Sequence, residues 1–176
     1  MTHALNESER DRLNRYFIDK PVSHDIVEYL LHFVNNKPLS VASSSTEFDD
    51  ESMDDLSNTE MFILDLAKKM IPVETSPSPY KGTIESWIHY ENDDGDDESN
   101  ISVRKDAEQW DDTDVVYTCV FWLEQGGHVM YEKNNQTHKD EIVKGMVMLF
   151  DGETTYIPYI GKGYQRYIIV QLVTDS

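Results

Sequence analysis

Cysteine, long apolar runs and an apolar leader are all scarce or missing in this sequence. Cys119 is the only cysteine, so the chain cannot form an internal disulfide, which fits a reducing compartment. No run approaches the roughly 18 apolar residues that span a bilayer, and residues 1–15 lack the apolar stretch of a secretory signal. We therefore expect an intracellular protein, cytoplasmic or nuclear, that has no membrane partner.

Basic residues are also few. The chain has 15 Lys and Arg against 34 Asp and Glu, which gives a formal net charge of −19 at pH 7. Binding to nucleic acid phosphates or to anionic lipids requires clustered Lys and Arg that neutralise the phosphates. We therefore expect no direct nucleic-acid binding. A basic protein partner remains open, as does plain solubility as the reason for the acidic excess.

Several catalytic and metal-binding motifs are missing as well. The chain has no Gly-rich phosphate loop, no Cys or His zinc pattern and no Gly-x-Ser-x-Gly elbow, so hydrolase and nucleotide-dependent functions have no support. Asp93–Glu98 is acidic, but it lacks the alternating ligand spacing and the closing Glu of an EF-hand. We expect a solvated turn there.

The N-terminal part, residues 8–71, carries helical patterns. One helix is expected from Ser8 to Pro21, and the clearest one follows a cap at Ser23. Its apolar stripe has the spacing i, i+3, i+4, i+7 and consists of Val27, Leu30, Leu31 and Val34. A third helix is expected after a cap at Thr59, and its predicted buried face comprises Phe62, Ile63, Leu66 and Met70.

Between the second and third helices lies a polar segment. Ser40–Ser57 consists largely of Ser, Thr, Asp and Glu, with hardly an aromatic residue. Such a composition buries too little apolar surface to offset the entropy lost on ordering. The sequence therefore predicts a disordered acidic loop over residues 40–57.

After the breaker segment Pro72–Pro79 the apolar pattern changes to that of short strands. At 176 residues and 39% apolar content the chain is long enough for one domain, 1–176. Helices followed by an antiparallel run of strands predict an α+β fold whose core, residues 80–174, is a sandwich or barrel of the jelly-roll type. The expected strands are 83–90, 115–123, 128–132, 146–150, 155–160 and 166–173.

One pair of residues on the first of these strands could bind a metal. In an extended strand, residues two apart point to the same side, so His89 and Glu91 could face one ion. Non-haem iron oxygenases hold Fe(II) with two His and one carboxylate. Alone, a His-x-acid pair is a weak signal, because it occurs by chance in many chains of this size.

The order of several further residues strengthens that signal. From residue 80 to 173 the chain resembles the prolyl-4-hydroxylase-like branch of the 2-oxoglutarate- and iron(II)-dependent oxygenases. The resemblance rests on Tyr80, Gly82, His89-Tyr90-Glu91, Leu123, Gly126-Gly127, Lys144-Gly145, Phe150 and Arg166-Tyr167, in this order.

The resemblance implies a double-stranded β-helix, also called a jelly roll. It also implies that His89 and Glu91 ligate the metal and that Arg166 and Tyr80 contact 2-oxoglutarate. A guanidinium such as that of Arg166 can hold a carboxylate through two charge-assisted hydrogen bonds. The other reading of Arg166 is a strand-surface ion pair in a very acidic protein, and both stay open.

The chain departs from the family pattern at two of the implied ligands. Glu91 stands where the family usually has Asp. The third ligand should be a His within Thr154–Tyr156, but there is no histidine from Lys139 onwards. Tyr156 occupies that place, and a phenol with a free pKa near 10 is a poor ligand for Fe(II) while protonated. His128 and His138 are conceivable substitutes, although neither is expected near His89.

These observations lead to three hypotheses. The first is an oxygenase-like fold with lost or altered catalysis, which binds a protein or peptide and has no cofactor assigned to it. The second is an active dioxygenase that hydroxylates a protein side chain with Fe(II) and 2-oxoglutarate. The third is an interaction module whose helical part, residues 8–70, makes the contacts.

Overall fold

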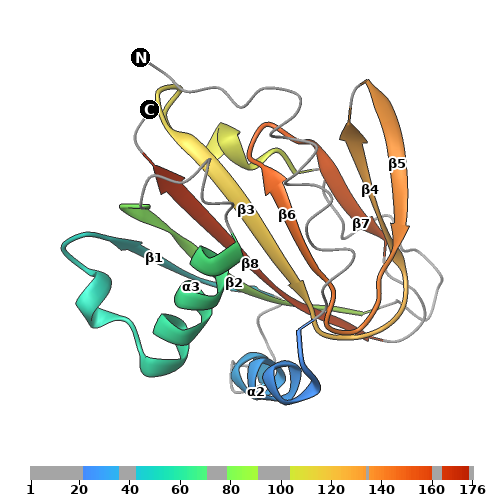
Figure 1. Ribbon diagram of the computed structural model, residues 1–176, viewed down its shortest axis with the longest axis horizontal. Coiled ribbons are helices and arrows are strands. Elements are labelled where there is room, and N and C mark those ends of the chain that lie inside the picture. Colours follow the sequence, from blue (N-terminus) through green and yellow to red (C-terminus); the bar gives the residue numbers. More distant parts are fainter. Residues whose placement is uncertain are drawn as a thin grey trace.

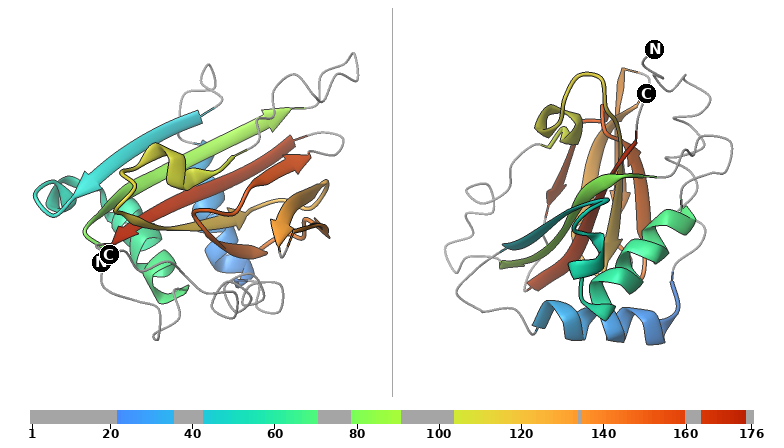
Figure 2. Two further views of the ribbon diagram at one scale, coloured as in Figure 1. Left: turned by 90° about the horizontal axis from the view of Figure 1, so that it is seen from above. Right: turned by 90° about the vertical axis from the view of Figure 1, so that its left-hand side faces the viewer.

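The computed structural model describes residues 22–35, 43–70, 79–90, 104–133, 135–159 and 164–174. Within them, two antiparallel sheets lie face to face, and the helices pack on the outer face of the larger sheet (Figures 1 and 2). The predicted α+β jelly roll is thereby confirmed. The expected helix from Ser8 to Pro21 and the acidic turn Asp93–Glu98 fall outside the described residues. None of the described helices is long and apolar enough to cross a membrane.

The larger sheet has five strands and the smaller one has three. The order in the larger sheet is β1-β2-β8-β3-β6, and in the smaller one β5-β4-β7. In the second half of the chain, the path crosses from one sheet to the other after β3, β5, β6 and β7, as in a jelly roll. The bounds are β1 Ser43–Asp49, β2 Lys81–Tyr90, β3 Val115–Trp122, β4 His128–Lys133, β5 Gln136–Glu141, β6 Val147–Asp151, β7 Tyr156–Tyr159 and β8 Tyr164–Thr174.

The second predicted helix is observed as α2, His24–Asn35. The Oγ of Ser23 accepts a hydrogen bond from the amide of Ile26 at 3.4 Å, so Ser23 caps the helix as expected. Val27, Leu30 and Val34 of the predicted stripe are buried, and Leu31 packs partly buried against the same core. The 3.6-residue period of the sequence therefore identified both the helix and its buried face.

The third helix, α3, runs from Asn58 to Met70, but its cap and buried face differ from the prediction. Ser57 and Glu60 bond reciprocally, amide to side chain, at 3.0 and 3.1 Å, so Ser57 caps the helix instead of Thr59. This reciprocal capping box satisfies two amides that lack helical partners. The buried residues are Ile63, Leu64 and Ala67, whereas Phe62 is 38% exposed.

Two cores lie on either side of the larger sheet, because successive residues of a strand point to opposite faces. Along β8, Ile168, Val170 and Leu172 belong to the core under the helices. Tyr167 and Ile169 belong to the core between the two sheets. Cys119 is fully buried, and burial raises the pKa of its thiol, so it behaves as a small apolar residue.

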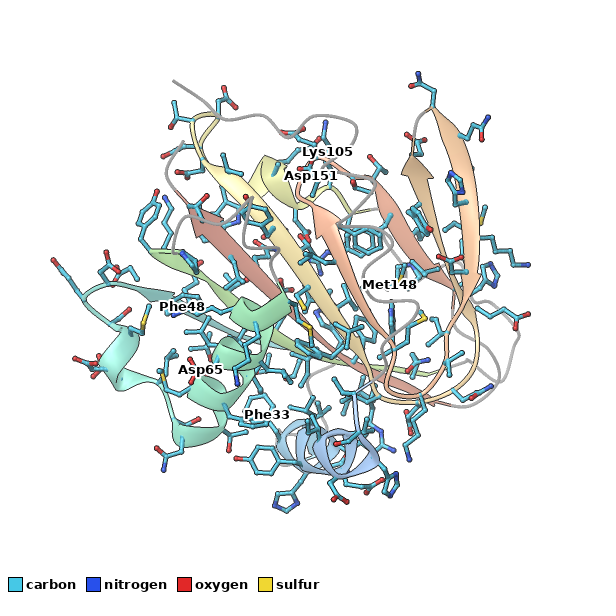
Figure 3. The ribbon with its side chains drawn as sticks, in the orientation of Figure 1. Phe33, Phe48, Asp65, Lys105, Met148 and Asp151 are labelled. Atoms are coloured by element: carbon cyan, nitrogen blue, oxygen red, sulfur yellow. The ribbon has the colours of Figure 1, made fainter. Side chains whose placement is uncertain are left out.

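The prediction of a disordered loop over residues 40–57 is wrong for its described part. Ser43–Asp49 form β1, which pairs with β2 over seven consecutive residue pairs. Phe48 is only 3% exposed and anchors the strand against the helix-side core (Figure 3). Gly82 makes room for it, since an added Cβ would lie 2.8 Å from the Phe48 ring and would overlap the carbonyl oxygen of Gln171. Composition does not reveal such pairing with a strand more than 30 residues away.

A second strand was also missed. Gln136–Glu141, which were not among the expected strands, form β5, the outer strand of the smaller sheet. Its side chains are exposed or half-buried, so no apolar alternation marks it in the sequence. Backbone pairing with β4, and not burial of apolar side chains, holds β5 on the sheet.

Candidate functional site

The place where the third metal ligand was expected lies beside an arginine. The amide of Arg104 donates to the carbonyl of Tyr156 at 2.8 Å, and the amide of Tyr156 donates back at 2.9 Å. This isolated bridge joins the segment that precedes the 3-10 helix η4, Asp106–Gln109, to the start of β7. Tyr156 therefore lies next to Arg104, Lys105 and Asp106. In this segment a basic residue and an acidic residue are two positions apart, as they are in His89-Tyr90-Glu91.

Asp106 is the centre of the contacts. Its side chain is fully buried, and its Oδ2 accepts hydrogen bonds from the hydroxyls of Thr118 at 2.7 Å and Tyr156 at 3.1 Å. Its Oδ1 accepts from Nε of Arg104 at 3.0 Å. Lys105, between Arg104 and Asp106, instead forms an exposed ion pair with Glu153 at 3.3 Å (Figure 3).

Arg104 holds a second carboxylate on the neighbouring strand. Its Nη1 and Nη2 donate to Oε1 and Oε2 of Glu85 at 3.2 and 3.1 Å, a two-point contact that only a planar guanidinium makes. Nη2 also lies 3.0 Å from Oδ1 of Asp106. The guanidinium sits over the Trp87 ring, with 5.8 Å between Cζ and the ring centroid. Arg104 therefore bridges two carboxylates, Glu85 on β2 and Asp106 at the start of η4.

The surroundings of Arg104 and Tyr156 keep both side chains protonated. Burial alone would lower the pKa of Arg104, but the acidic groups of Tyr156, Asp106 and Glu85 outweigh it and raise that pKa. Burial, followed by the charge of Asp106, raises the pKa of Tyr156 well above its usual value. Arg104 is thus a permanent cation and Tyr156 a neutral phenol that donates its proton to Asp106.

Further polar side chains complete the contacts of Glu85. Nε2 of Gln171 donates to Oε2 of Glu85 at 3.2 Å, and Nε1 of Trp87 donates to Oε1 at 3.2 Å. Gln171 is fully buried and also accepts from Trp110. We call this set the Arg104 cluster; it consists of Glu85, Arg104, Asp106, Thr118, Tyr156 and Gln171.

The side chains of the Arg104 cluster are unsuitable as ligands for Fe(II). An iron site of this class needs two imidazole nitrogens and a carboxylate with free lone pairs. A guanidinium has no lone pair to give, and both carboxylates of the cluster already accept from Arg104. Among the residues that the structure describes, no three His, Cys, Asp or Glu lie together as a metal would need.

Of the two predicted metal ligands, the structure places only the backbone of His89. His89 pairs with Gln165 in the β2–β8 ladder, four residues along β2 from Glu85, which is about 13 Å at the rise of an extended strand. The side chain of His89 and the whole of Glu91 lie outside the described residues, so their role stays a prediction. The possible substitutes are stacked on tyrosines of the smaller sheet, His128 on Tyr159 and His138 on Tyr131.

Arg166 was predicted to bind 2-oxoglutarate, and the structure places it on the helix side of β8. Its Nη1 donates to Oδ1 of Asn35 in α2 at 2.6 Å, and its Nη2 forms an ion pair with Glu124. Glu124 also accepts from the backbone amide of Arg166 at 3.0 Å. Arg166 lines a groove of about 650 Å³ between α2, Lys144 and the loop that follows β3.

Tyr80, the other residue predicted to contact 2-oxoglutarate, lies at the opposite end of the larger sheet. Its amide donates to the carbonyl of Val173 at 3.0 Å, whereas Arg166 pairs with Ile88. Eight residues of β2 separate the two positions, about 26 Å. Its hydroxyl donates to Asp114 at 2.7 Å. Arg166 and Tyr80 are therefore not brought together.

The sequence held one signal for the Arg104 cluster that went unused. Arg104-Lys105-Asp106 has a spacing comparable with His89-Tyr90-Glu91, but it follows an acidic stretch without apolar alternation, so no strand was expected there. Knowledge of the segment that pairs with Tyr156 would have identified Arg104-Lys105-Asp106. Glu85 could not be found this way, because its contact with Arg104 depends on how β2 crosses the fold.

Comparisons with known proteins agree on the fold. No family profile and no curated protein matches the chain. Among solved structures, a Pseudomonas putida prolyl-4-hydroxylase has a TM-score of 0.63 at 12% identity, covering 97% of this chain and 99% of that one. A prolyl 4-hydroxylase from Phytophthora capsici has a TM-score of 0.61 at 13% identity, covering 97% and 63%. An oxidoreductase of the 2OG-Fe(II) oxygenase family from Burkholderia pseudomallei has 0.59 at 9%, covering 99% and 92%. At these identities the likeness shows the fold alone.

Proposed function

We propose that this chain has the fold of the 2-oxoglutarate- and iron(II)-dependent oxygenases without their iron chemistry, and that it works by binding a protein or peptide. The observation that carries the proposal is the Arg104 cluster. At the position where the resemblance implies the third iron ligand, the neutral phenol of Tyr156 donates to Asp106, which is already paired with Arg104.

The energetics of the cluster oppose metal uptake by its carboxylates. A metal ion that used Glu85 and Asp106 would have to displace the guanidinium of Arg104, whose side chain is only 15% exposed. Breaking a buried ion pair by removing one partner costs about 3–5 kcal/mol. Arg104 balances the charge of one carboxylate and contacts both, so a second cation would have to share Glu85 and Asp106 with the guanidinium.

The contacts of Arg166 point in the same direction. A 2-oxoglutarate carboxylate that used Arg166 would compete with Glu124, which contacts both the guanidinium and the backbone amide of the same residue. Glu124 belongs to the same chain, so no separate ligand has to be bound for this contact to form. Arg166 therefore already has a carboxylate partner and does not depend on 2-oxoglutarate to supply one.

The likeness to the Pseudomonas putida prolyl-4-hydroxylase favours a second candidate function. In this alternative the chain is an active dioxygenase that hydroxylates a protein side chain. His89 and Glu91 would then hold Fe(II) together with a ligand from elsewhere, and Arg166 and Tyr80 would hold 2-oxoglutarate. The iron would supply oxygen activation.

Thermal unfolding separates the two candidates. A ligand at a hundred times its dissociation constant stabilises the folded state by about 2.7 kcal/mol, which is several degrees for a chain of this size. We expect no shift with anaerobic Fe(II), or with Mn(II), together with millimolar 2-oxoglutarate, while a prolyl 4-hydroxylase measured alongside shifts. A shift that needs both ligands and disappears in His89→Ala would establish the alternative.

A further inference from the structure

The outer edge of β1 is the open end of the larger sheet. β1 stands at one end of the strand order, and none of the described elements pairs with its far side (Figures 1 and 2). Its seven residues pair with β2 in an unbroken register. Every second residue of an edge strand turns its amide and carbonyl away from its neighbour, so this edge offers a regular row of backbone donors and acceptors.

The other sheet ends differ from β1. All five residues of β6 are buried, and the start of β7 is already bonded to Arg104. β5 is exposed but carries Lys139 in its middle, and an edge lysine is one of the devices that discourage further pairing. β1 has no lysine and no proline; its charged residues, Glu47 and Asp49, are both acidic, so they oppose an acidic strand but not a basic one.

The charge around β1 indicates which strand it accepts. Every ionisable side chain from residue 43 to residue 67 is acidic. Glu47 on the strand, Asp50 and Glu51 on the turn that follows, and Asp54 in the 3-10 helix η1, Met53–Asp55, are exposed. Opposite charges on adjacent strands stabilise pairing and like charges oppose it. A second copy of this very acidic chain is therefore a poor occupant, and a basic segment is a good one.

We propose that the outer edge of β1 receives an extended, Lys- or Arg-containing segment of a partner protein as an additional antiparallel or parallel strand. The backbone bonds supply affinity in this mode of recognition, and the acidic side chains select basic sequences. This inference deepens the proposed binding function by naming the surface and the class of partner.

The test uses a fluorescein-labelled peptide, Thr-Lys-Val-Lys-Thr-Lys-Val-Lys-Thr, and the full chain at physiological salt. We expect saturable binding that is lost when glutamate replaces each lysine of the peptide. N-methylation of the peptide backbone keeps every charge but removes the donors, and it should weaken binding at least tenfold. Hydrogen exchange should slow at the β1 amides when the peptide binds.

Two protein variants localise the site. Glu47→Lys combined with Asp50→Lys should weaken binding at least tenfold. The control, Glu132→Lys combined with Glu141→Lys, changes the net charge equally on exposed positions of the smaller sheet and should stay within twofold of the unmodified chain. Circular dichroism checks that all variants are folded, and the N-methylated peptide tests the same inference without any change to the protein.

Several results would overturn the inference. These are equal binding of the N-methylated peptide, equal weakening by both variants, or no binding at millimolar peptide. A concentration-dependent dimer that Glu47→Lys abolishes would assign the edge to a second copy. Peptide binding alongside metal and 2-oxoglutarate binding would remove only the proposed lack of iron chemistry. No peptide binding and no metal binding would remove only the role of β1.

Discussion

The hydroxyl of Tyr156 donates a hydrogen bond to the buried carboxylate of Asp106 across 3.1 Å, although fifty residues separate them in the chain. The same carboxylate receives Arg104, whose backbone is bonded to that of Tyr156. A tyrosine, an aspartate and an arginine therefore meet where the resemblance to iron oxygenases implies a metal ligand.

Replacing Tyr156 with Phe should destabilise the fold. The change removes one donor to a buried charged acceptor and leaves the packing of the ring on Phe150 intact. Hydrogen bonds to charged groups contribute about 1.5–3 kcal/mol, and urea unfolding should show a loss in that range. Tyr159→Phe is the matched control on the same strand, with an expected change below about 0.5 kcal/mol. Equal effects of the two substitutions would contradict the assigned role.

Replacing Arg104 with Met should cost more than any other single change in the cluster. It leaves Glu85 and Asp106 buried without their cation, a loss of about 3–5 kcal/mol. Arg104→Lys should recover only part of this, because an ammonium cannot make the two-point contact with Glu85 while also reaching Asp106. A thermal unfolding series of the three proteins would reject the account if Arg104→Met stayed within about 1 kcal/mol of the unmodified chain.

Asp114 should contribute to stability against acid. Burial would raise its pKa, but hydrogen bonds from Tyr80 and Lys81 and the charge of Lys81 outweigh it and lower that pKa. A group whose pKa is lower in the folded state stabilises the fold above its unfolded pKa of about 3.9. That stability is lost as the pH falls through the folded pKa. Asp114→Asn should therefore flatten the pH dependence of the melting temperature below about pH 4, and an unchanged slope would argue against the assignment.

A metal site should appear when the cluster is given the missing ligands. Arg104→His with Tyr156→His places two imidazoles next to Asp106, and Glu85→Gln removes the carboxylate that would otherwise lose its cation. Co(II) titration should give visible absorption bands with this triple variant and none with the unmodified chain. Adding Asp106→Asn to the variant is the control that should remove the bands. Bands of equal strength in the unmodified chain would contradict the account.

The fold was largely predictable because its signals are local and periodic. The stripe of α2, the apolar runs of β3 and β6, and the order of glycines and aromatics from Tyr80 to Tyr167 all appear in the sequence. β1 and β5 were not predicted, because their residues are mostly polar and gain order from backbone pairing with β2 and β4. Such pairing leaves no apolar period to detect.

The site was harder to predict because its contacts span the chain. Glu85, Arg104 and Tyr156 come from three separate segments, and only the crossing of the two sheets brings them together. The sequence did show that no histidine follows His138 and that Tyr156 stands where the third metal ligand is expected. It could not reveal that an arginine with two carboxylates lies beside Tyr156, since long-range ion pairs leave no spacing pattern.

Binding of Mn(II) in the presence and absence of 2-oxoglutarate, followed by the electron paramagnetic resonance signal of free Mn(II), tests whether the chain lacks an oxygenase metal site. The acidic surface of a chain with net charge −19 can hold cations weakly, so the informative quantity is the part that depends on 2-oxoglutarate. The account predicts that adding millimolar 2-oxoglutarate leaves the free Mn(II) signal unchanged. A stoichiometric loss of that signal, dependent on 2-oxoglutarate and abolished by His89→Ala, would contradict it.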